Sequence, residues 1–241
     1  MDRAVFDDRP VCKDRIPVLL PVRNMAGTVE RAIQSLLNDG VTQIIVIDDG
    51  STDGTAEVVM RLAEGNKSIT MLRSELNGGL GHALNLGLKL CDSDFVLRQD
   101  ADDESYWGRS GSLRAALESQ PNAVAAASWF VHETQPGKVK HGVVHAFPNE
   151  VTTSDLLNGW RFPHAAAMYR RSALLQVGGW PEDMQCSEDQ LLHLRLSRIG
   201  KLIVIPHALY FVGDGGNRQV KNHDTVYWDR VAVERFQKGL A

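Results

Sequence analysis

Two aspartates separated by one residue, Asp100 and Asp102, form the most distinctive chemical pair in the sequence. They follow Phe95-Val96-Leu97, a short apolar run that is typical of a buried strand. A hard divalent cation such as Mg²⁺ takes oxygen ligands, commonly one or two carboxylates together with the phosphates of a substrate. An isolated pair of this kind is a weak signal, because Asp is also frequent in turns for structural reasons. Its weight therefore depends on the other acidic groups that the fold brings to it.

A second acidic turn, Asp48-Asp49-Gly50-Ser51, ends the β-branched run 43–47. A carboxylate here could accept the imide N–H of a uracil base, and the helix that follows offers free backbone N–H groups at its start. In the alternative interpretation, Asp53 or Thr55 only caps that helix, which is compatible with base binding by Asp49. The chain has no GxxxxGK[ST] loop, and no GxGxxG follows the first strand, which argues against a dinucleotide dehydrogenase.

The third acidic group is Glu188-Asp189, after Ser187 at the start of a predicted helix. A carboxylate near a helix N-terminus is stabilised in its ionised form, which is the form that a general base needs. Alternatively, Ser187 caps the helix and the two acids only complement its dipole. The three acidic groups together are much more specific than any one of them.

The elements that must position these acids alternate along the chain, which predicts an α/β fold with a mainly parallel sheet. Helical spacing after Thr28, a plausible N-cap, ends at Asp39-Gly40. The carboxyl ends of parallel strands share one edge of a sheet, so the first two acidic turns should face one crevice. The predicted strands are 16–20, 43–47 and 95–97, and the predicted helices are 29–37, 56–63 and 80–88.

The second half is less regular, with a possible hairpin between Ala123 and Phe147. We expect a helix at 153–158, an apolar stretch at 165–169, a helix over 191–199 and a strand at 202–205. The sequence predicts a single domain over 1–241, with a donor half to about residue 105 and an acceptor half from about 106.

Composition excludes several classes of function. The net charge of −4 and the absence of a basic stripe make nucleic acid an improbable partner. No run of about 18 apolar residues occurs, and acids occupy the N-terminal stretch, so we expect no transmembrane segment and a cytoplasmic location. Cys12, Cys91 and Cys186 are widely spaced, which predicts three separate thiols.

Taken in order, these motifs resemble family 2 inverting glycosyltransferases of the GT-A fold, in which a Rossmann-like nucleotide-binding sheet merges with an acceptor-binding half. The resemblance extends roughly from Ile16 to Ile205 and is carried by both the order and the spacing of the motifs. The matching segments are Pro21-Val22-Arg23-Asn24, the stretch 46–55 with its DDGSTDGT, Asn77-Gly78-Gly79-Leu80-Gly81, Asp100-Ala101-Asp102-Asp103, and Glu188-Asp189.

The resemblance implies a nucleotide-sugar donor, with a UDP-sugar favoured by the family, and a divalent cofactor, Mn²⁺ or Mg²⁺. Asp102 would ligate the metal that bridges the diphosphate, and Asp100 would contact the ribose or the metal. Asp103 would support that site. Asp189 would be the catalytic base, with Glu188 beside it. The implied nucleotide-sugar contacts are Pro21, Arg23, Asn24, Asp49, Gly79, Asp100 and Ala101.

The chain departs from the family where Arg23 replaces an aromatic residue, which leaves a phosphate contact or a surface ion pair as alternatives. A late histidine ligand is also in doubt, with His207 and His223 as candidates. On the acceptor side, Trp160 and Trp180 could stack on a sugar or simply pack in the core, and His164 could line the same cleft.

The implied reaction transfers a sugar to a hydroxyl of a glycan or of a lipid-linked saccharide, with possible peripheral association at the inner face of a membrane. Two alternatives remain open. One is a sugar nucleotidyltransferase, which would be expected to carry a Gly- and Lys/Arg-rich phosphate loop near the first strand. The other is a non-catalytic nucleotide-sugar-binding subunit of a larger synthase.

Overall fold

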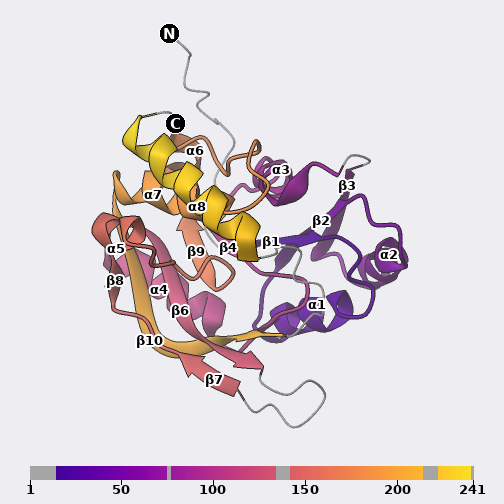
Figure 1. Ribbon diagram of the computed structural model, residues 1–241. Helices are drawn as coiled ribbons and strands as arrows, with labels where there is room; N and C mark the ends of the chain where they lie inside the picture. The colour runs from indigo at the N-terminus through magenta and orange to yellow at the C-terminus, as the bar shows by residue number, and fades with distance from the viewer. Residues whose placement is uncertain (1–14, 75–76, 134–141, 214–221, 240–241) are drawn as a thin grey trace.

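A ten-stranded sheet forms the centre of the computed structural model, with the strand order β3-β2-β1-β4-β9-β6-β10-β5 and with β7 and β8 paired to β6 and β10 (Figure 1). The structure describes residues 15–74, 77–133, 142–213 and 222–239. The strands are β1 Pro17–Val22, β2 Gln43–Asp49, β3 Ile69–Ser74, β4 Phe95–Arg98, β5 Glu104–Ser105, β6 Ala123–Glu133, β7 Gly142–His145, β8 Glu150–Val151, β9 Ala167–Arg170 and β10 Lys201–Val212. The helices are α1 Val29–Asn38, α2 Thr55–Gly65, α3 Gly79–Leu88, α4 Arg109–Ser119, α5 Thr153–Leu157, α6 Arg171–Gln176, α7 Glu188–Ser197 and α8 Asn222–Gln237.

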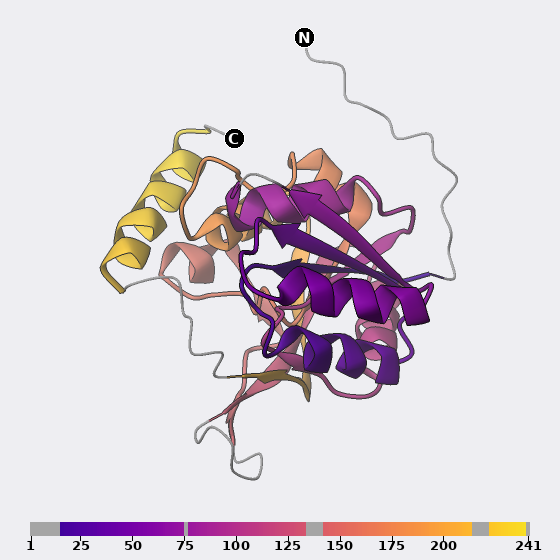
Figure 2. The same cartoon turned by 90° about the vertical axis from the view of Figure 1, so that its right-hand side faces the viewer.

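Strands β3, β2, β1 and β4 are parallel, as the alternating pattern predicts. Successive residues of β1 point to opposite faces, so Leu19 joins the core under α3 while Val18 and Leu20 join the core under α1. The close approach of α3 depends on Gly87, because a Cβ there would lie 2.7 Å from Leu19 Cδ2. Figure 2 shows α1, α2 and α3 covering this half of the sheet.

The second half of the sheet mixes strand directions. Strand β9 is antiparallel to both β4 and β6, whereas β10 runs parallel to β6. The predicted hairpin is present as β6 and β7, although its connection lies outside the described residues. The last strand continues to Val212, well beyond the predicted 202–205, with register shifts along its pairing with β6. The sequence analysis did not predict β3, α4 or α8.

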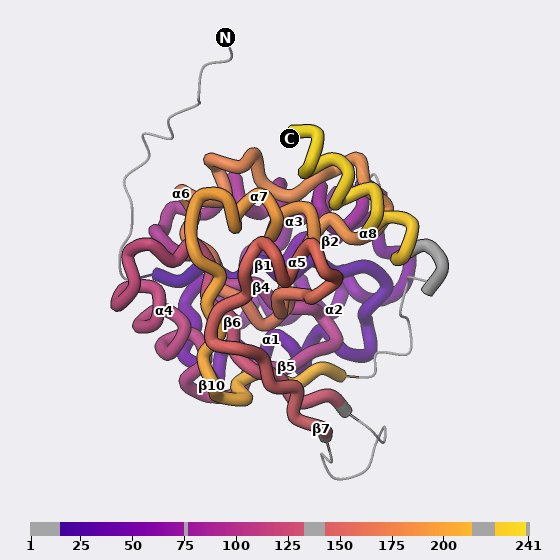
Figure 3. Tube along the Cα trace, turned by 60° about the vertical axis from the view of Figure 1, so that its left-hand side comes forward, coloured from indigo at the N-terminus to yellow at the C-terminus, as the bar shows by residue number. Residues whose placement is uncertain are grey.

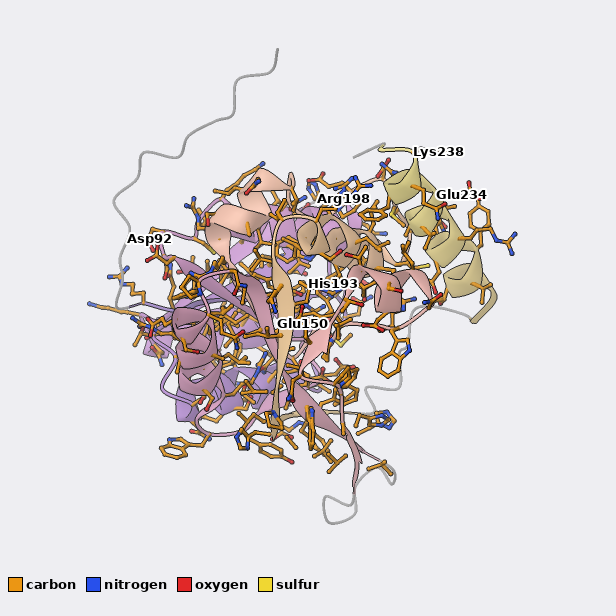
Figure 4. The ribbon with its side chains drawn as sticks, turned by 90° about the vertical axis from the view of Figure 1, so that its left-hand side faces the viewer. Asp92, Glu150, His193, Arg198, Glu234 and Lys238 are labelled. Carbon is orange, nitrogen blue, oxygen red and sulfur yellow. The ribbon has the colours of Figure 1, made fainter. Side chains whose placement is uncertain are left out.

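Helix α8 packs across α7 at the end of the chain, which is visible from two sides (Figures 1 and 3). Its Ala232 and Phe236 are buried, and Arg198 lies over the Phe236 ring at 3.8 Å while donating to the Phe236 carbonyl at 2.7 Å. Figure 4 labels Arg198 beside this helix, together with Glu234 on the helix and Lys238 just after its end. Among the described residues, no helix combines the length and apolar character needed to cross a bilayer.

Candidate active site

One cavity of about 1090 Å³ opens where β1 and β4 end and α7 begins, and it brings together side chains from distant parts of the sequence. Its lining includes seven of the predicted site residues: Arg23, Gly79, Asp100, Asp102, His164, Glu188 and Asp189. A smaller adjoining cavity of about 170 Å³ shares Arg23, Gly79 and Asp100 and adds Pro21 and Asp49. The first two acidic turns and the acid pair of α7 therefore face a common space.

Two predicted nucleotide contacts take a different position. Asn24 is exposed, has a positive φ of 53°, and accepts a hydrogen bond from the Thr52 N–H at 2.9 Å. It ties the loop after β1 to the loop after β2, and it lines neither cavity. Ala101 is 3% exposed and packs in the core, because the turn directs Asp100 and Asp102 outward and the residue between them inward. Neither residue lines the two cavities, and their contact with the donor stays a prediction.

Asp49 organises the glycine-rich loop that precedes α3. Its Oδ1 accepts from the Gly78 N–H at 2.9 Å and its Oδ2 accepts from the Gly79 N–H at 2.8 Å. Gly79 has a φ of +84°, a conformation that favours glycine. A carboxylate has about four lone-pair positions, so Asp49 keeps acceptor capacity toward the small cavity. Asp53 receives hydrogen bonds from the Thr55 and Ala26 N–H groups, so it joins the two loops as well as the start of α2.

A buried arginine lies beside the first acidic group. Arg98 Nη1 contacts Asp100 Oδ1 at 2.6 Å, and the Arg98 side chain is 2% exposed. Burial would lower the pKa of Arg98, but the charge of Asp100 outweighs this and raises the pKa above its usual value. Arg98 follows three apolar residues of a buried strand, where a cation is rare, so the sequence carried a signal for this residue that the acidic motifs did not include.

The neighbouring carboxyls hold their protons more tightly than usual. Burial, followed by the charge of Asp100, raises the pKa of Asp102. Burial and the charges of Asp100 and Asp102 raise the pKa of Asp103 well above its usual value. Asp103 Oδ1 accepts from the Gly213 N–H at 2.9 Å, so it attaches the end of β10 to this turn. Of these three carboxyls, Asp100 and Asp102 line the large cavity and Asp103 does not.

The third acidic group, Glu188 and Asp189, begins α7. Glu188 is 8% exposed, and its burial, together with the charge of Asp189, raises its pKa to about 7. Asp189 Oδ1 accepts from Arg161 Nη1 at 3.2 Å and from the Gln190 N–H at 2.9 Å. Within the described residues, Asp189 Oδ2 has no hydrogen-bond partner. The Asp189 carboxylate thus has one oxygen, Oδ1, held by two hydrogen bonds, while Oδ2 remains available to a ligand in the cavity.

Ser187 does not cap α7 as the alternative interpretation supposed. It occupies the N-cap position with a left-handed φ of 60°, and its side chain makes no cap hydrogen bond. Its buried Oγ is unpaired among the residues that the structure describes. Such a backbone conformation is costly for a residue other than glycine, and residues in strained conformations tend to cluster at functional sites.

The two predicted stacking residues have different surroundings. Trp180 is 1% exposed, so neither face of its ring is available to a sugar, and of the two alternatives the structure supports core packing. Trp160 is 50% exposed but does not line the large cavity. Of the late histidines, His207 is exposed on β10 and lines no part of this cavity, and the His223 side chain lies outside the described residues.

Trp180 nevertheless acts on the cavity through His164. The indole N–H donates to His164 Nε2 at 2.9 Å, and because indole nitrogen is only a donor, neutral His164 carries its proton on Nδ1. Burial and the charge of Arg98 lower the pKa of His164 well below its usual value, which favours that neutral form. Behind it, Tyr169 Oη and His193 Nε2 lie 2.9 Å apart in the interior, where Figure 4 labels His193.

Residues 18–178 match the family described as Glycosyl transferase family 2. The match covers more than half of the 241 residues, and the protein belongs to this family. The resemblance based on the acidic motifs is thereby confirmed. The match ends before α7 and α8, so it does not include Glu188, Asp189 or any of the C-terminal helix.

Individual proteins agree with this assignment. The chain is similar to the succinoglycan biosynthesis protein ExoU of Rhizobium meliloti, with 34% identity over 229 residues covering 89% of this chain and 66% of that protein. Among solved structures, it resembles S. aureus TarS 1–349 in complex with UDP-GlcNAc, with a TM-score of 0.72 and 20% identity over 92% of this chain and 66% of that one.

A second solved structure is the mannosyltransferase PcManGT from Pyrobaculum calidifontis in complex with GDP-Man and Mn²⁺. Its TM-score is 0.64 at 20% identity, and the match covers 87% of this chain and 61% of that one. These structural matches confirm the mixed α/β architecture expected of the GT-A fold. The chain spans about two thirds or less of each of the three proteins.

Proposed function

We propose that this protein transfers a sugar, with inversion, from a UDP-sugar to an acceptor hydroxyl in glycan synthesis. The observation that carries the proposal is the large cavity, whose lining includes Asp100 and Asp102 together with Asp189. The first two carboxylates suit the diphosphate of a donor, and Asp189 suits the proton of an acceptor. The names of ExoU and of the TarS complex support glycan synthesis and a UDP-sugar, respectively.

The nucleotide would enter the smaller cavity beside Pro21 and Asp49. Remaining lone pairs of Asp49 would accept the imide N–H of uracil, while Asp49 continues to hold the Gly78 and Gly79 amides. Arg23 lines both cavities, so it can contact phosphate groups at their junction. Arg98 adds a buried positive charge nearby.

The carboxylates fit a divalent cation shared with the donor. Asp102 lines the cavity, and its raised pKa reflects burial and the adjacent charge of Asp100, which a bound cation would offset. Asp100 is already paired with Arg98, so Asp102 is the principal candidate ligand, with Asp100 assisting. Mg²⁺ or Mn²⁺ held there with the diphosphate would supply Lewis-acid neutralisation of the leaving group's charge.

The chain's own residues account for the acceptor's activation. Asp189 Oδ2 accepts the proton of the acceptor hydroxyl while Arg161 and the Gln190 N–H hold Oδ1 in place. The hydroxyl oxygen forms a bond to the anomeric carbon as the bond to the nucleoside diphosphate breaks on the opposite face. The Nδ1–H of His164 is a donor for a hydroxyl in the cavity.

The two alternative functions predict other features. A sugar nucleotidyltransferase would be expected to carry a Gly- and Lys/Arg-rich loop after β1, where this chain has Pro21-Val22-Arg23-Asn24. A non-catalytic binding subunit would not need the exposed oxygen of Asp189. No observation on the described residues favours either alternative over the proposed function.

The decisive experiment compares transfer with donor binding in Asp189→Asn, which preserves side-chain volume but removes the proton acceptor. Calorimetry should detect binding of UDP-sugars in preference to GDP-sugars, and the binding should strengthen when Mn²⁺ is added. We expect sugar transfer or donor hydrolysis to fall by about 10²- to 10⁴-fold in the variant, with donor affinity nearly unchanged. Near-normal activity would overturn the role of Asp189, and a preference for GDP-sugars would overturn the donor assignment.

A further inference from the structure

The side chain of Arg161 joins the proposed catalytic base to the C-terminal helix. Arg161 Nη1 donates to Asp189 Oδ1 at 3.2 Å, while Nη2 makes a short contact with Asp229 Oδ1 on α8. Arg161, Asp189 and Asp229 are 35%, 23% and 36% exposed, respectively, so the bridge lies at the edge of the cavity. Thr225, one turn earlier on α8, also lines the cavity.

A shared guanidinium has a specific consequence for Asp189. The guanidinium group forms a planar fork that prefers to bind one carboxylate through two parallel hydrogen bonds. Here Asp229 occupies Nη2, so Arg161 reaches Asp189 through Nη1 and only Oδ1 is engaged. Without Asp229, the fork would be free to turn and cover both oxygens of Asp189, including the one that must accept the acceptor's proton.

Asp229 is held in place by the packing of α8. Ala232 and Phe236 are buried, and Arg198 donates to the Phe236 carbonyl at 2.7 Å. A second ion pair, from Arg235 Nη1 to both oxygens of Asp183 at 2.9 Å, lies at the far end of the helix, but it is exposed and adds little to this packing. The helix therefore presents Asp229 to Arg161 from a fixed position.

We propose that Asp229 is a positioning residue for sugar transfer. By taking one arm of Arg161, it keeps Asp189 Oδ2 open to the acceptor hydroxyl, and α8 is thus part of the catalytic apparatus. The inference rests on the proposed role of Asp189. Asp229 itself does not line the cavity and would not touch either substrate.

The test uses Asp229→Asn in the full chain, with Arg235→Gln as its matched control. Each substitution removes one ion pair between α8 and the rest of the protein, but only the first lies on the path to Asp189. We expect kcat of Asp229→Asn to fall by about tenfold, with the Kd for the donor within about twofold of wild type and the melting temperature close to that of the control. Arg235→Gln should keep the wild-type kcat. Equal kcat values for the two variants would overturn the proposal.

Two further variants separate positioning from folding. Asp229→Glu keeps a carboxylate and should recover most of the lost kcat, which a merely structural effect of the asparagine would not predict. In an Arg161→Gln background, Asp229→Asn should have no additional effect, because the proposed route passes only through Arg161. Additive losses would overturn the proposal. If Asp189→Asn retains full activity, the role of Asp189 fails instead, whatever Asp229 does.

Discussion

The two acidic groups of the cavity each have one arginine, and the two arginines differ in burial and in sharing. Arg98 is 2% exposed and is paired with Asp100 at the end of a central strand. Arg161 is 35% exposed and divides its guanidinium between Asp189 and Asp229. The first arrangement places a permanent positive charge beside the proposed diphosphate site. The second anchors a carboxylate while leaving one of its oxygens available.

The difference follows from where each pair lies in the fold. A buried ion pair is strongly destabilised when one partner is lost, because the remaining charge keeps its desolvation penalty without compensation. An exposed pair contributes little, since water screens it and the long side chains lose conformational freedom. The pair beside the proposed diphosphate site thus combines burial with charge, whereas the pair at Asp189 depends on the orientation of a more exposed side chain.

The largest effect expected from this comparison is on stability. Asp100→Asn should lower the free energy of unfolding by about 3 kcal/mol, the lower end of the range for breaking a buried pair, because it leaves the Arg98 guanidinium, 2% exposed, without its counter-charge. Arg161→Met should cost less than about 1 kcal/mol. Urea unfolding of both variants measures the difference. Equal losses would contradict the distinction between a buried and an exposed cation.

How far the sequence predicts these groups depends on the kind of signal each one leaves. The strands and the acidic turns after them were predictable, because β1, β2 and β4 are apolar runs whose carboxyl ends share one edge. That Glu188 lines the same cavity as Asp100 and Asp102 could be expected only from the family resemblance, since no local pattern specifies how α7 lies against the sheet.

Other parts of the site could not be found from local patterns. The bridge from Arg161 to Asp229 joins residues 68 apart in sequence. Helix α8 carries Val226 and Tyr227 on its exposed surface, which obscures the apolar stripe that buries Ala232 and Phe236. Residue type alone left Trp180 between sugar stacking and core packing, because type does not distinguish a ring inside the core from one at its surface.

The next effect concerns the response to pH. The pKa of Glu188 is about 7 in the folded protein, above its ordinary value of 4.5, because of burial and the charge of Asp189. The folded state therefore binds more protons at this site than the unfolded state between those values, and this contribution to stability is lost as pH rises through about 7. In the wild-type protein, this effect should lower the free energy of unfolding by an amount on the order of 2 kcal/mol between pH 5 and pH 8. Glu188→Gln should remove that decrease.

Denaturant unfolding of wild type and Glu188→Gln at the two pH values measures this change. Burial also raises the pKa of Asp102 and Asp103, so the wild-type protein will show other losses of the same sign. The difference between the two proteins isolates Glu188. Parallel pH profiles would show that the Glu188 carboxyl is better solvated than its 8% exposure indicates.

The smallest effect should come from Trp180→Phe, which tests the neutral donor that lines the same cavity as the two charged groups. Phenylalanine keeps an aromatic ring in the core but removes the N–H that donates to His164 Nε2 at 2.9 Å. His164 can then carry its proton on either nitrogen, and its Nδ1–H is no longer fixed toward the hydroxyl it is proposed to bind. We expect KM for the acceptor to rise by about two- to fivefold, with a stability cost of about 1 kcal/mol for the lost hydrogen bond.

The same substitution in a His164→Ala background should leave KM at the value of the His164→Ala parent, because the indole N–H would have no imidazole to orient. A further rise in that background would mean that Trp180 shapes the cavity directly, and an unchanged KM in the single variant would remove His164 from acceptor binding.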